Sequence, residues 1–467
     1  MKNTYLIQHS LWKKISIFLF FSPLLTLVSC DSFVEVDLPN SQLTNVSVFQ
    51  SYPTANAAMA DVYAKIRDKG LLTGTVSGLS NQLGNYADEL TFYSASNFPA
   101  LEYYTNNLLP SNTSISTMWN NTYNQIYAAN AVLEGVGGSA FGTQEKQGLQ
   151  GEALFVRALL HFYLLQLFGD IPYLQTTDYQ VNSVVSRLAG DQVYTYIIND
   201  LKKAGELLPA AYSSLERVRP NAFAAKALLA RVYLYRGAWA DAVKTSSEVI
   251  TNSSLYAFES DLVKVFLKNS PETIWQFIPT VAGKNTDEAI LFTFTSGPPA
   301  LVALSESLIS SFAASDQRKA AWTTAITSGG KSWSYVSKYK EPKNTTTSRE
   351  YSIVLRLTEQ YLIRAEASAQ AGDLAAARED LDKIRKRAGL SGSAASSKEE
   401  LLAAIIDERR KELFAEYGHR FFDLKRTGRL DGALSVKPGW NSSDRLLPIP
   451  ESELSVNPNL KPQNPGY

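Results

Sequence analysis

Apolar residues recur every three or four positions along most of this chain, which is the spacing of amphipathic α-helices. Residues 52–69 show this spacing between a Tyr-Pro-Thr start and a glycine stop. Residues 145–168 become apolar on nearly every side, as a buried helix does. Further amphipathic stretches cover 188–209 and 398–418. The pattern predicts a mainly α-helical, all-α protein.

Polar stretches rich in glycine, serine and asparagine interrupt this helical pattern. They carry most of the isolated aromatic residues, and the apolar runs at 272–279 and 289–295 are candidates for short strands. We therefore expect a single domain over 51–467, in which a helical scaffold carries inserted loop regions at about 70–116 and 251–350.

Two of the helical segments repeat each other around a glycine, Gly237 in one and Gly372 in the other. Alanines lie seven residues before and five residues after each glycine, and a bulky residue lies two after it: Ala230, Ala242 and Trp239, then Ala365, Ala377 and Leu374. Small residues where two helices touch, with a glycine at the turn, are typical of tetratricopeptide repeats. The degenerate pairs that we expect in addition are 52–69 with 114–134, and 145–168 with 189–208.

The start of the chain has the composition of an export signal. A basic pair and an apolar run, too short for a membrane span of about 20 residues, precede Cys30, the single cysteine. The four residues that end at Cys30, LVSC, resemble the lipobox of bacterial lipoproteins. This resemblance implies a signal peptide over 1–29, a lipid on the Cys30 sulfur and a lipidated tether over 30–50. The alternative is an ordinary signal peptide with a stray cysteine.

Composition and motifs argue against several function classes. Cleavage before Cys30 leaves 42 basic and 45 acidic residues, without a basic field for nucleic acid, and no cysteine for a disulfide or metal. His161 lies in an apolar helix, where we expect a packed core residue, and His419 lies beside arginine and phenylalanine. No H-E-x-x-H, G-x-S-x-G or phosphate-binding glycine loop occurs. We therefore expect no enzyme, no cofactor and no metal site.

The C-terminal hundred residues carry a family signature. "IIDERRKELFAEYGHRFFDLKRTGRL", followed by "LLPIPESELSVNPNLKPQNPGY", resembles the SusD/RagB family of outer-membrane nutrient-binding lipoproteins. The resemblance extends to the lipobox, to "EALFVRALLHFYLLQLFGDIP" and to "LTEQYLIRAEASAQAGD". It implies an α-helical fold with four tetratricopeptide-like helix pairs, a loop-rich ligand-binding subdomain and an ordered, extended C-terminal tail. It also implies a lipid-anchored protein facing the cell exterior, which binds nutrient oligomers and passes them to a SusC-like, TonB-dependent transporter.

Acidic and basic residues alternate at spacings of three and four within this signature. The acids are Glu408, Glu412 and Glu416, and the bases are Arg409, Lys411 and Arg420. We interpret them as a salt-bridged helix that ties a loop to the body of the protein. The alternative is a catalytic carboxylate cluster.

Ligand-binding residues are expected in the loops, because sugar capture needs flat aromatic faces and groups that hydrogen-bond hydroxyls. Segment 85–107 supplies the candidates Asp88, Tyr93, Asn97, Phe98, Tyr103 and Tyr104. A second set in the later loops is Phe292, Trp322, Trp333 and Tyr335, together with Phe294. We expect only a minority of these rings to touch ligand, while the others pin loops to the scaffold.

Two other functions stay open beside glycan binding. The first candidate segment has no tryptophan, usually the best platform for sugar, so a peptide ligand is an alternative. A helical-repeat lipoprotein that only organises partner proteins is another, since repeat helices present extended concave surfaces.

Overall fold

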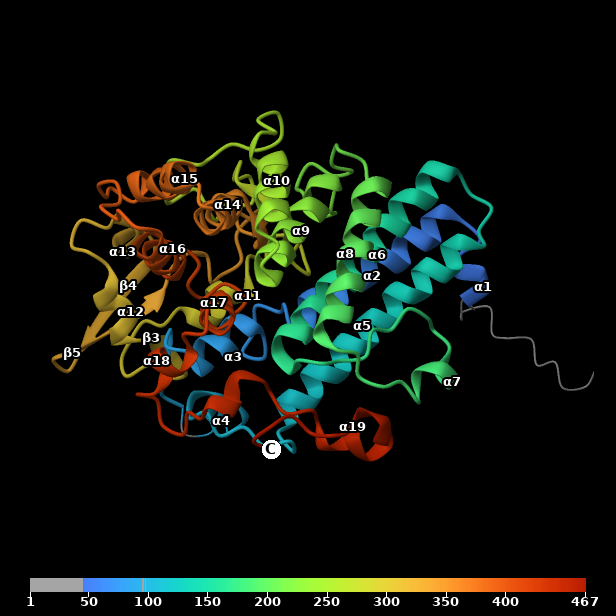
Figure 1. Cartoon of the computed structure of the whole chain (residues 1–467), viewed down its shortest axis with the longest axis horizontal. Helices are drawn as coiled ribbons and strands as arrows, with labels where there is room; N and C mark the ends of the chain where they lie inside the picture. The colour runs from blue at the N-terminus through green and yellow to red at the C-terminus, as the bar shows by residue number, and fades with distance from the viewer. Residues whose placement is uncertain (1–44, 95, 97) are drawn as a thin grey trace, which may run out of the picture. The chain divides into compact units, whose positions relative to one another are not determined.

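The computed structural model of the protein describes residues 45–94, 96 and 98–467. Its long helices form an array in which each packs on the next, running from right to left across Figure 1. In chain order they are α2 (Tyr52–Asp68), α5 (Thr113–Gly137), α6 (Thr143–Phe168), α8 (Gly190–Leu207), α9 (Ala222–Arg236), α10 (Trp239–Ile250), α14 (Leu357–Ala371), α15 (Leu374–Arg387) and α16 (Lys398–Glu412). The four expected pairs, α2–α5, α6–α8, α9–α10 and α14–α15, are confirmed.

The two sequence repeats coincide with two of these pairs. Gly237 and Gly372 end α9 and α14 with φ of +78° and +94°, a left-handed backbone that favours glycine. The four alanines of the repeats, Ala230, Ala242, Ala365 and Ala377, are all fully buried. Small residues thus lie where the paired helices touch, as the spacing predicted.

Strands are few and short, and they pair antiparallel. β1 (Leu90–Phe92) pairs with β3 (Val302–Leu304), β2 (Thr273–Phe277) with β6 (Ser352–Arg356), and β4 (Thr323–Ser328) forms a hairpin with β5 (Lys331–Val336). The strand expected at 272–279 is confirmed by β2. The strand expected at 289–295 is wrong, because Asp287–Phe292 form α11. The side chain of Thr286 caps this helix by accepting from the Ala289 amide at 3.1 Å, and two acidic residues occupy its first turn.

The remaining helices are shorter. They are α1 (Asn45–Val48), α3 (Leu79–Tyr86), α4 (Phe98–Tyr104), α7 (Tyr179–Asn182), α12 (Glu306–Ser311), α13 (Gln317–Trp322), α17 (His419–Arg426), α18 (Leu430–Leu434) and α19 (Glu451–Val456), with 3-10 turns η2 (Ser442–Arg445) and η3 (Pro458–Leu460).

Helix α6 forms the centre of the apolar core. Among the described residues it is the one helix long and apolar enough to cross a membrane, yet 94% of that stretch is buried within the protein. The C-terminal tail is tied to its end, where the Leu447 amide donates to the Leu167 carbonyl at 2.8 Å and Asn464 Nδ2 donates to the Phe168 carbonyl at 2.8 Å. α19 and η3 interrupt the extended course of the tail.

The charged residues of the C-terminal signature form a buried network. The interpretation of these charges as salt bridges that tie the helix to the rest of the protein is confirmed, because the three acids pair with other elements. Glu408 pairs with Arg318 and Arg385, Glu412 with Arg318, Arg356 and Arg387, and Glu416 with Lys338 and Arg356. The three bases pair elsewhere: Arg409 with Asp423, Lys411 with Asp407, and Arg420 with Asp88.

Candidate functional site

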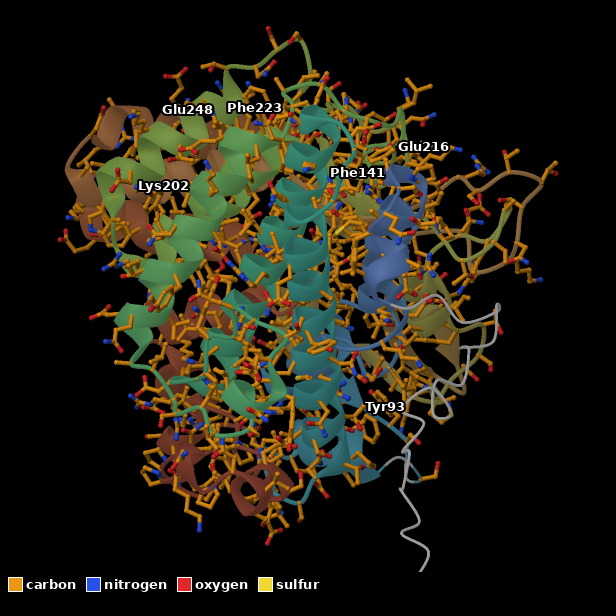
Figure 2. All side chains as sticks on the ribbon, turned by 90° about the vertical axis from the view of Figure 1, so that its right-hand side faces the viewer. Tyr93, Phe141, Lys202, Glu216, Phe223 and Glu248 are labelled. Carbon is orange, nitrogen blue, oxygen red and sulfur yellow. The ribbon has the colours of Figure 1, made fainter. Side chains whose placement is uncertain are left out.

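Tyr93 stands at the surface directly after β1. Its amide continues the strand ladder by donating to the Leu301 carbonyl at 2.8 Å. Because side chains alternate along a strand, Leu90 and Phe92 point into the core while Tyr93 points to the other face. Its ring is 40% exposed and lies at the edge of the molecule in Figure 2. Tyr93 therefore presents a ring face to solvent.

Two further rings come from the hairpin strand β5. Trp333 and Tyr335 are two residues apart, so they share one face of the strand, and both are half-buried. A Cβ on Gly297 would lie 2.2 Å from the Trp333 ring, which therefore packs directly on the glycine backbone. Phe294, in the same loop as Gly297, meets Tyr335 edge to face with ring centres 5.2 Å apart.

Tyr104, at the end of α4, completes the group. Its ring centre is 6.3 Å from that of Phe92, and the Lys437 Nζ lies 4.9 Å from the ring. Burial raises the pKa of Tyr93, and the nearby Tyr104 raises it further. A hydrogen bond from Trp333 lowers this pKa, so Tyr93, Tyr104 and Trp333 are close enough to affect one another. Tyr93, Tyr104, Phe294, Trp333 and Tyr335 are called the aromatic cluster below.

Lys437 and Gly297 belong to this site, although sequence reasoning missed both. Burial lowers the pKa of Lys437 to about 7. Its Nζ donates to the backbone carbonyls of Asn85 and Ala87, the latter at 2.6 Å. It lies more than 300 residues from these partners in the chain, so no local pattern could have placed it there.

Three other predicted rings lie inside the protein. Tyr103, Phe292 and Trp322 are 0%, 3% and 0% exposed, so none offers a ring face to a ligand in this structure. The Trp322 Nε1 donates to the Leu262 carbonyl at 2.9 Å, and Tyr103 packs edge to face on Tyr86. These rings pin loops to the body, as was expected for most of the candidates.

Asp88 is engaged in an ion pair. Its two carboxylate oxygens accept from Arg420 at 2.7 and 2.8 Å, and one also accepts from Arg410 at 2.9 Å. Burial alone would raise the pKa of Asp88, but these guanidinium groups lower it below its usual value. Asn97, the side chain of Phe98, and Cys30 lie outside the described residues.

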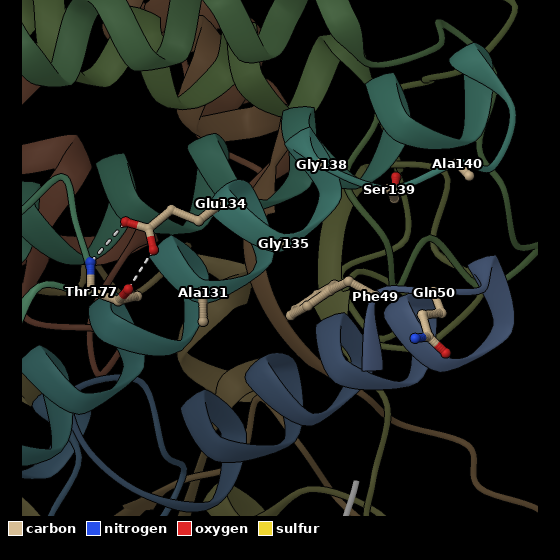
Figure 3. Close-up of a pocket in the computed structure, with 9 residues that line it drawn as sticks. All are labelled: Phe49, Gln50, Ala131, Glu134, Gly135, Gly138, Ser139, Ala140 and Thr177. Carbon is tan, nitrogen blue, oxygen red and sulfur yellow. Dashed lines mark hydrogen bonds between the residues drawn. The ribbon is translucent and has the colours of Figure 1, made fainter. Parts of the chain in front are cut away.

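A cavity of about 500 Å³ lies away from the aromatic cluster, between α1 and the end of α5 (Figure 3). The ring of Phe49 forms one wall, and Gly135 and Gly138 line it. The Glu134 carboxylate on its rim already accepts from the Thr177 amide at 2.8 Å and from the Thr177 hydroxyl. Because the one carboxylate that lines this cavity is already hydrogen-bonded, the cavity provides fewer groups that can bind a sugar than the exposed rings do.

The two histidines in the described part of the chain are packed. His161 is fully buried, stacks on Tyr173 with ring centres 3.9 Å apart, and burial lowers its pKa to about 3, which confirms a core residue. His419 is also buried, and burial with several nearby arginines lowers its pKa well below its usual value. Across the described ranges, no group of three or more His, Cys, Asp or Glu is placed to hold a metal ion.

Sequence comparison identifies the family behind this fold. Residues 41–234 match the profile described as starch-binding and associating with the outer membrane, and residues 305–467 match the profile of the SusD family. The chain belongs to the SusD/RagB family. The family assignment from the C-terminal signature is thereby confirmed.

Relatives match this SusD/RagB chain over nearly its whole length. SusD-like protein P2 of Formosa agariphila is 27% identical over 95% of this chain and 98% of its own. A SusD-like protein of Bacteroides fragilis has a TM-score of 0.77 at 23% identity, covering 90% of this chain and 98% of its own. A laminarin-binding SusD-like protein has a TM-score of 0.75 at 24% identity, covering 89% and 99%. The solved structures establish the shared fold.

Proposed function

We propose that this protein binds an oligosaccharide or polysaccharide through the aromatic cluster and delivers it to a SusC-like, TonB-dependent transporter. The observation that carries the proposal is the convergence of five rings from four segments of the chain, which are the end of β1, α4, the loop after α11 and β5. A sugar ring presents apolar C–H faces that stack on such rings, while its hydroxyls need polar partners. A relative of the same fold is named for laminarin binding, which supports a glycan as the ligand class.

The cluster is built to hold its rings in place before a ligand arrives. Trp333 is fixed against Gly297, and Tyr335 against Phe294. Because little side-chain freedom is left to lose on binding, more of the contact energy contributes to affinity. Asp88, the one carboxylate among the candidate residues, is held by Arg410 and Arg420 and is not free to act as an acid or a base. We therefore propose a binding role without catalysis.

The test is to replace Trp333 and Tyr93 singly by alanine and to measure affinity for soluble laminarin and starch. Losing one stacked ring should cost on the order of 1–3 kcal/mol, a weakening of roughly tenfold or more. The melting temperature should hold, because both rings are at least partly exposed. Gly297→Ala should also weaken binding by displacing the Trp333 ring without removing it.

Tyr179→Ala is the matched control, since that ring is 76% exposed but outside the cluster. Affinity that falls equally in the control, or holds in both cluster variants, would remove the sugar platform from this surface. If the protein binds a peptide mixture and neither glycan, and Trp333→Ala and Tyr93→Ala lose this binding, then the ligand is a peptide. No ligand of either kind would favour the scaffold function.

The same proposal predicts location and partner. We expect a lipid on Cys30, an outer-membrane position facing the exterior, and a large β-barrel transporter that co-purifies after mild detergent extraction. Cross-linking in intact cells, followed by mass spectrometry, measures this directly. A chain recovered only as a monomer would contradict the delivery step while leaving ligand binding intact.

A further inference from the structure

A second cavity of about 500 Å³ lies between α16, α17 and α18, and three arginines line it. They are Arg410 on α16, Arg420 on α17 and Arg429 at the turn between α17 and α18. One acid, Asp407, also lines the cavity, and it is paired with Lys411. The cavity is called the arginine pocket below. Its lining therefore carries more positive than negative charge.

The positive charge is not neutralised by the protein. A single carboxylate, that of Asp88, pairs with both Arg410 and Arg420. Together these two arginines and the aspartate keep a net charge of +1. The Nε of Arg410 is buried and has no hydrogen-bond partner among the described residues. Burial, and to a lesser extent the charge of Arg420, lowers the pKa of Arg410, although Asp88 opposes the change. A buried donor left without a partner is costly, so Asp88 and Ser307 do not satisfy the whole Arg410 guanidinium.

Arg429 adds a third cation that nothing in the described chain holds. Its side chain is exposed, and it makes no ion pair or side-chain hydrogen bond among the described residues. Gly428 places it there through a turn with φ of +68°, and the Arg429 amide donates to the Leu424 carbonyl at 2.8 Å. A Cβ on Gly428 or Gly432 would meet nothing within 4 Å, so both glycines border open space.

We propose that the arginine pocket binds an acidic sugar residue through its carboxylate or sulfate group. Guanidinium groups present paired N–H donors whose geometry matches an oxyanion, and such charge-assisted bonds are stronger than neutral ones. Ile406, Leu424 and three small residues, Ala403, Gly432 and Ala433, complete the lining of the pocket. Its volume exceeds what a bare inorganic ion would need. The ligand class is therefore an anionic glycan.

This pocket is separate from the aromatic cluster. The pocket is lined by residues of α16, α17 and α18, whereas the rings of the aromatic cluster come from the end of β1, from α4, from the loop after α11 and from β5. Asp88 precedes β1 and Tyr93 follows it, so the two sites flank the same short strand from opposite ends. Binding in the arginine pocket does not require the aromatic cluster.

The test measures binding of oligogalacturonate to the full chain by calorimetry, with a sulfated oligosaccharide, a neutral oligosaccharide, inorganic sulfate and inorganic phosphate as further probes. Arg429→Gln removes an exposed cation and should weaken oligogalacturonate binding about tenfold, the value of one charge-assisted bond. Gly432→Glu places a carboxylate in the open space and should abolish it. Arg349→Gln, which removes an exposed arginine on a different loop, is the matched control and should change nothing.

Each outcome decides the proposal. Binding of either acidic oligosaccharide that is lost in Arg429→Gln and Gly432→Glu, but kept in Trp333→Ala and Arg349→Gln, supports it, and the stronger of the two names the anionic group. Inorganic sulfate or phosphate binding as tightly as the sugars would overturn a sugar ligand. Acidic sugars that fail to bind, or that bind equally to all variants, would overturn the site itself.

Discussion

Helices α6 and α16 are both buried, yet they are filled by different chemistry. Of the nineteen buried residues of α6, four are polar: Glu152, Arg157, His161 and Gln166. Of the six buried residues of α16, three are charged: Glu408, Arg409 and Glu412. The first helix is held by apolar packing, whereas the second is held by ion pairs whose partners come from α13, β6, α15 and α17.

The difference shows which kind of burial can tolerate the loss of one side chain. An apolar cavity costs lost contacts, while a buried charge deprived of its partner keeps its full desolvation penalty. Burial would raise the pKa of Glu412, but Arg387, Arg356 and Arg318 together lower it, which shows how far its ionised form depends on them. The C-terminal network should therefore be the more fragile region.

The largest effect is expected from Arg356→Ala. The Arg356 guanidinium donates to Glu412 at 2.8 Å and to Glu416 at 2.9 and 3.0 Å, all inside the protein. Removing it should cost about 3–5 kcal/mol of unfolding free energy, measured by urea denaturation at pH 8. The cost should shrink at pH 5, because Glu412 and Glu416, each left with one cation fewer, can then take up protons more easily.

Leu159→Ala on α6 is the matched control, since Leu159 is also fully buried. It should cost about 2–5 kcal/mol, with no such dependence on pH. A loss below about 1 kcal/mol for Arg356→Ala, or the same loss at both pH values, would show that the network is not held by charge.

The same contrast explains what the sequence could predict of the fold. Apolar spacing located the long helices, because a core helix of this kind shows its burial in its own residues, as α6 does. The repeat around Gly237 and Gly372 located two helix pairs, because the alanines and the glycine of each pair lie close together in the sequence. The partners of Glu412 could not be predicted, because Arg318, Arg356 and Arg387 are distant in sequence and charged residues are usually exposed.

The candidate site was predicted only in part, because the sequence did not show which of the aromatic side chains are buried. Trp322 and Trp333 lie eleven residues apart, yet one is fully buried and the other packs at the surface against Gly297. Trp322 ends α13 and points into the core, whereas Trp333 lies on a hairpin strand. The sequence around an aromatic residue in a loop does not show whether its ring faces solvent or the core. Ring type alone therefore cannot distinguish a ring that contacts a ligand from one that packs inside the protein.

A smaller effect of buried charge is expected at Glu89, which precedes β1. Burial raises the pKa of Glu89 to about 8, with Asp88 adding to this and Arg420 and Lys338 opposing it. The folded protein therefore holds a proton on Glu89 that the unfolded chain has lost above its usual pKa of 4.5. By linkage, this contribution to stability is full below pH 4.5 and is lost as pH rises through about 8.

Glu89→Gln should remove that dependence, because glutamine matches the protonated carboxyl and cannot ionise. We expect the variant to be about as stable as the natural protein at pH 5 and more stable at pH 9 by on the order of 1–3 kcal/mol. Burial lowers the pKa of Lys338 to about 8, which gives the opposite slope, and both proteins keep this group. Thermal unfolding of both proteins from pH 5 to pH 9 measures the effect. Parallel curves would mean that Glu89 stays ionised inside the fold, so that Arg420 and Lys338, and not a bound proton, offset its burial.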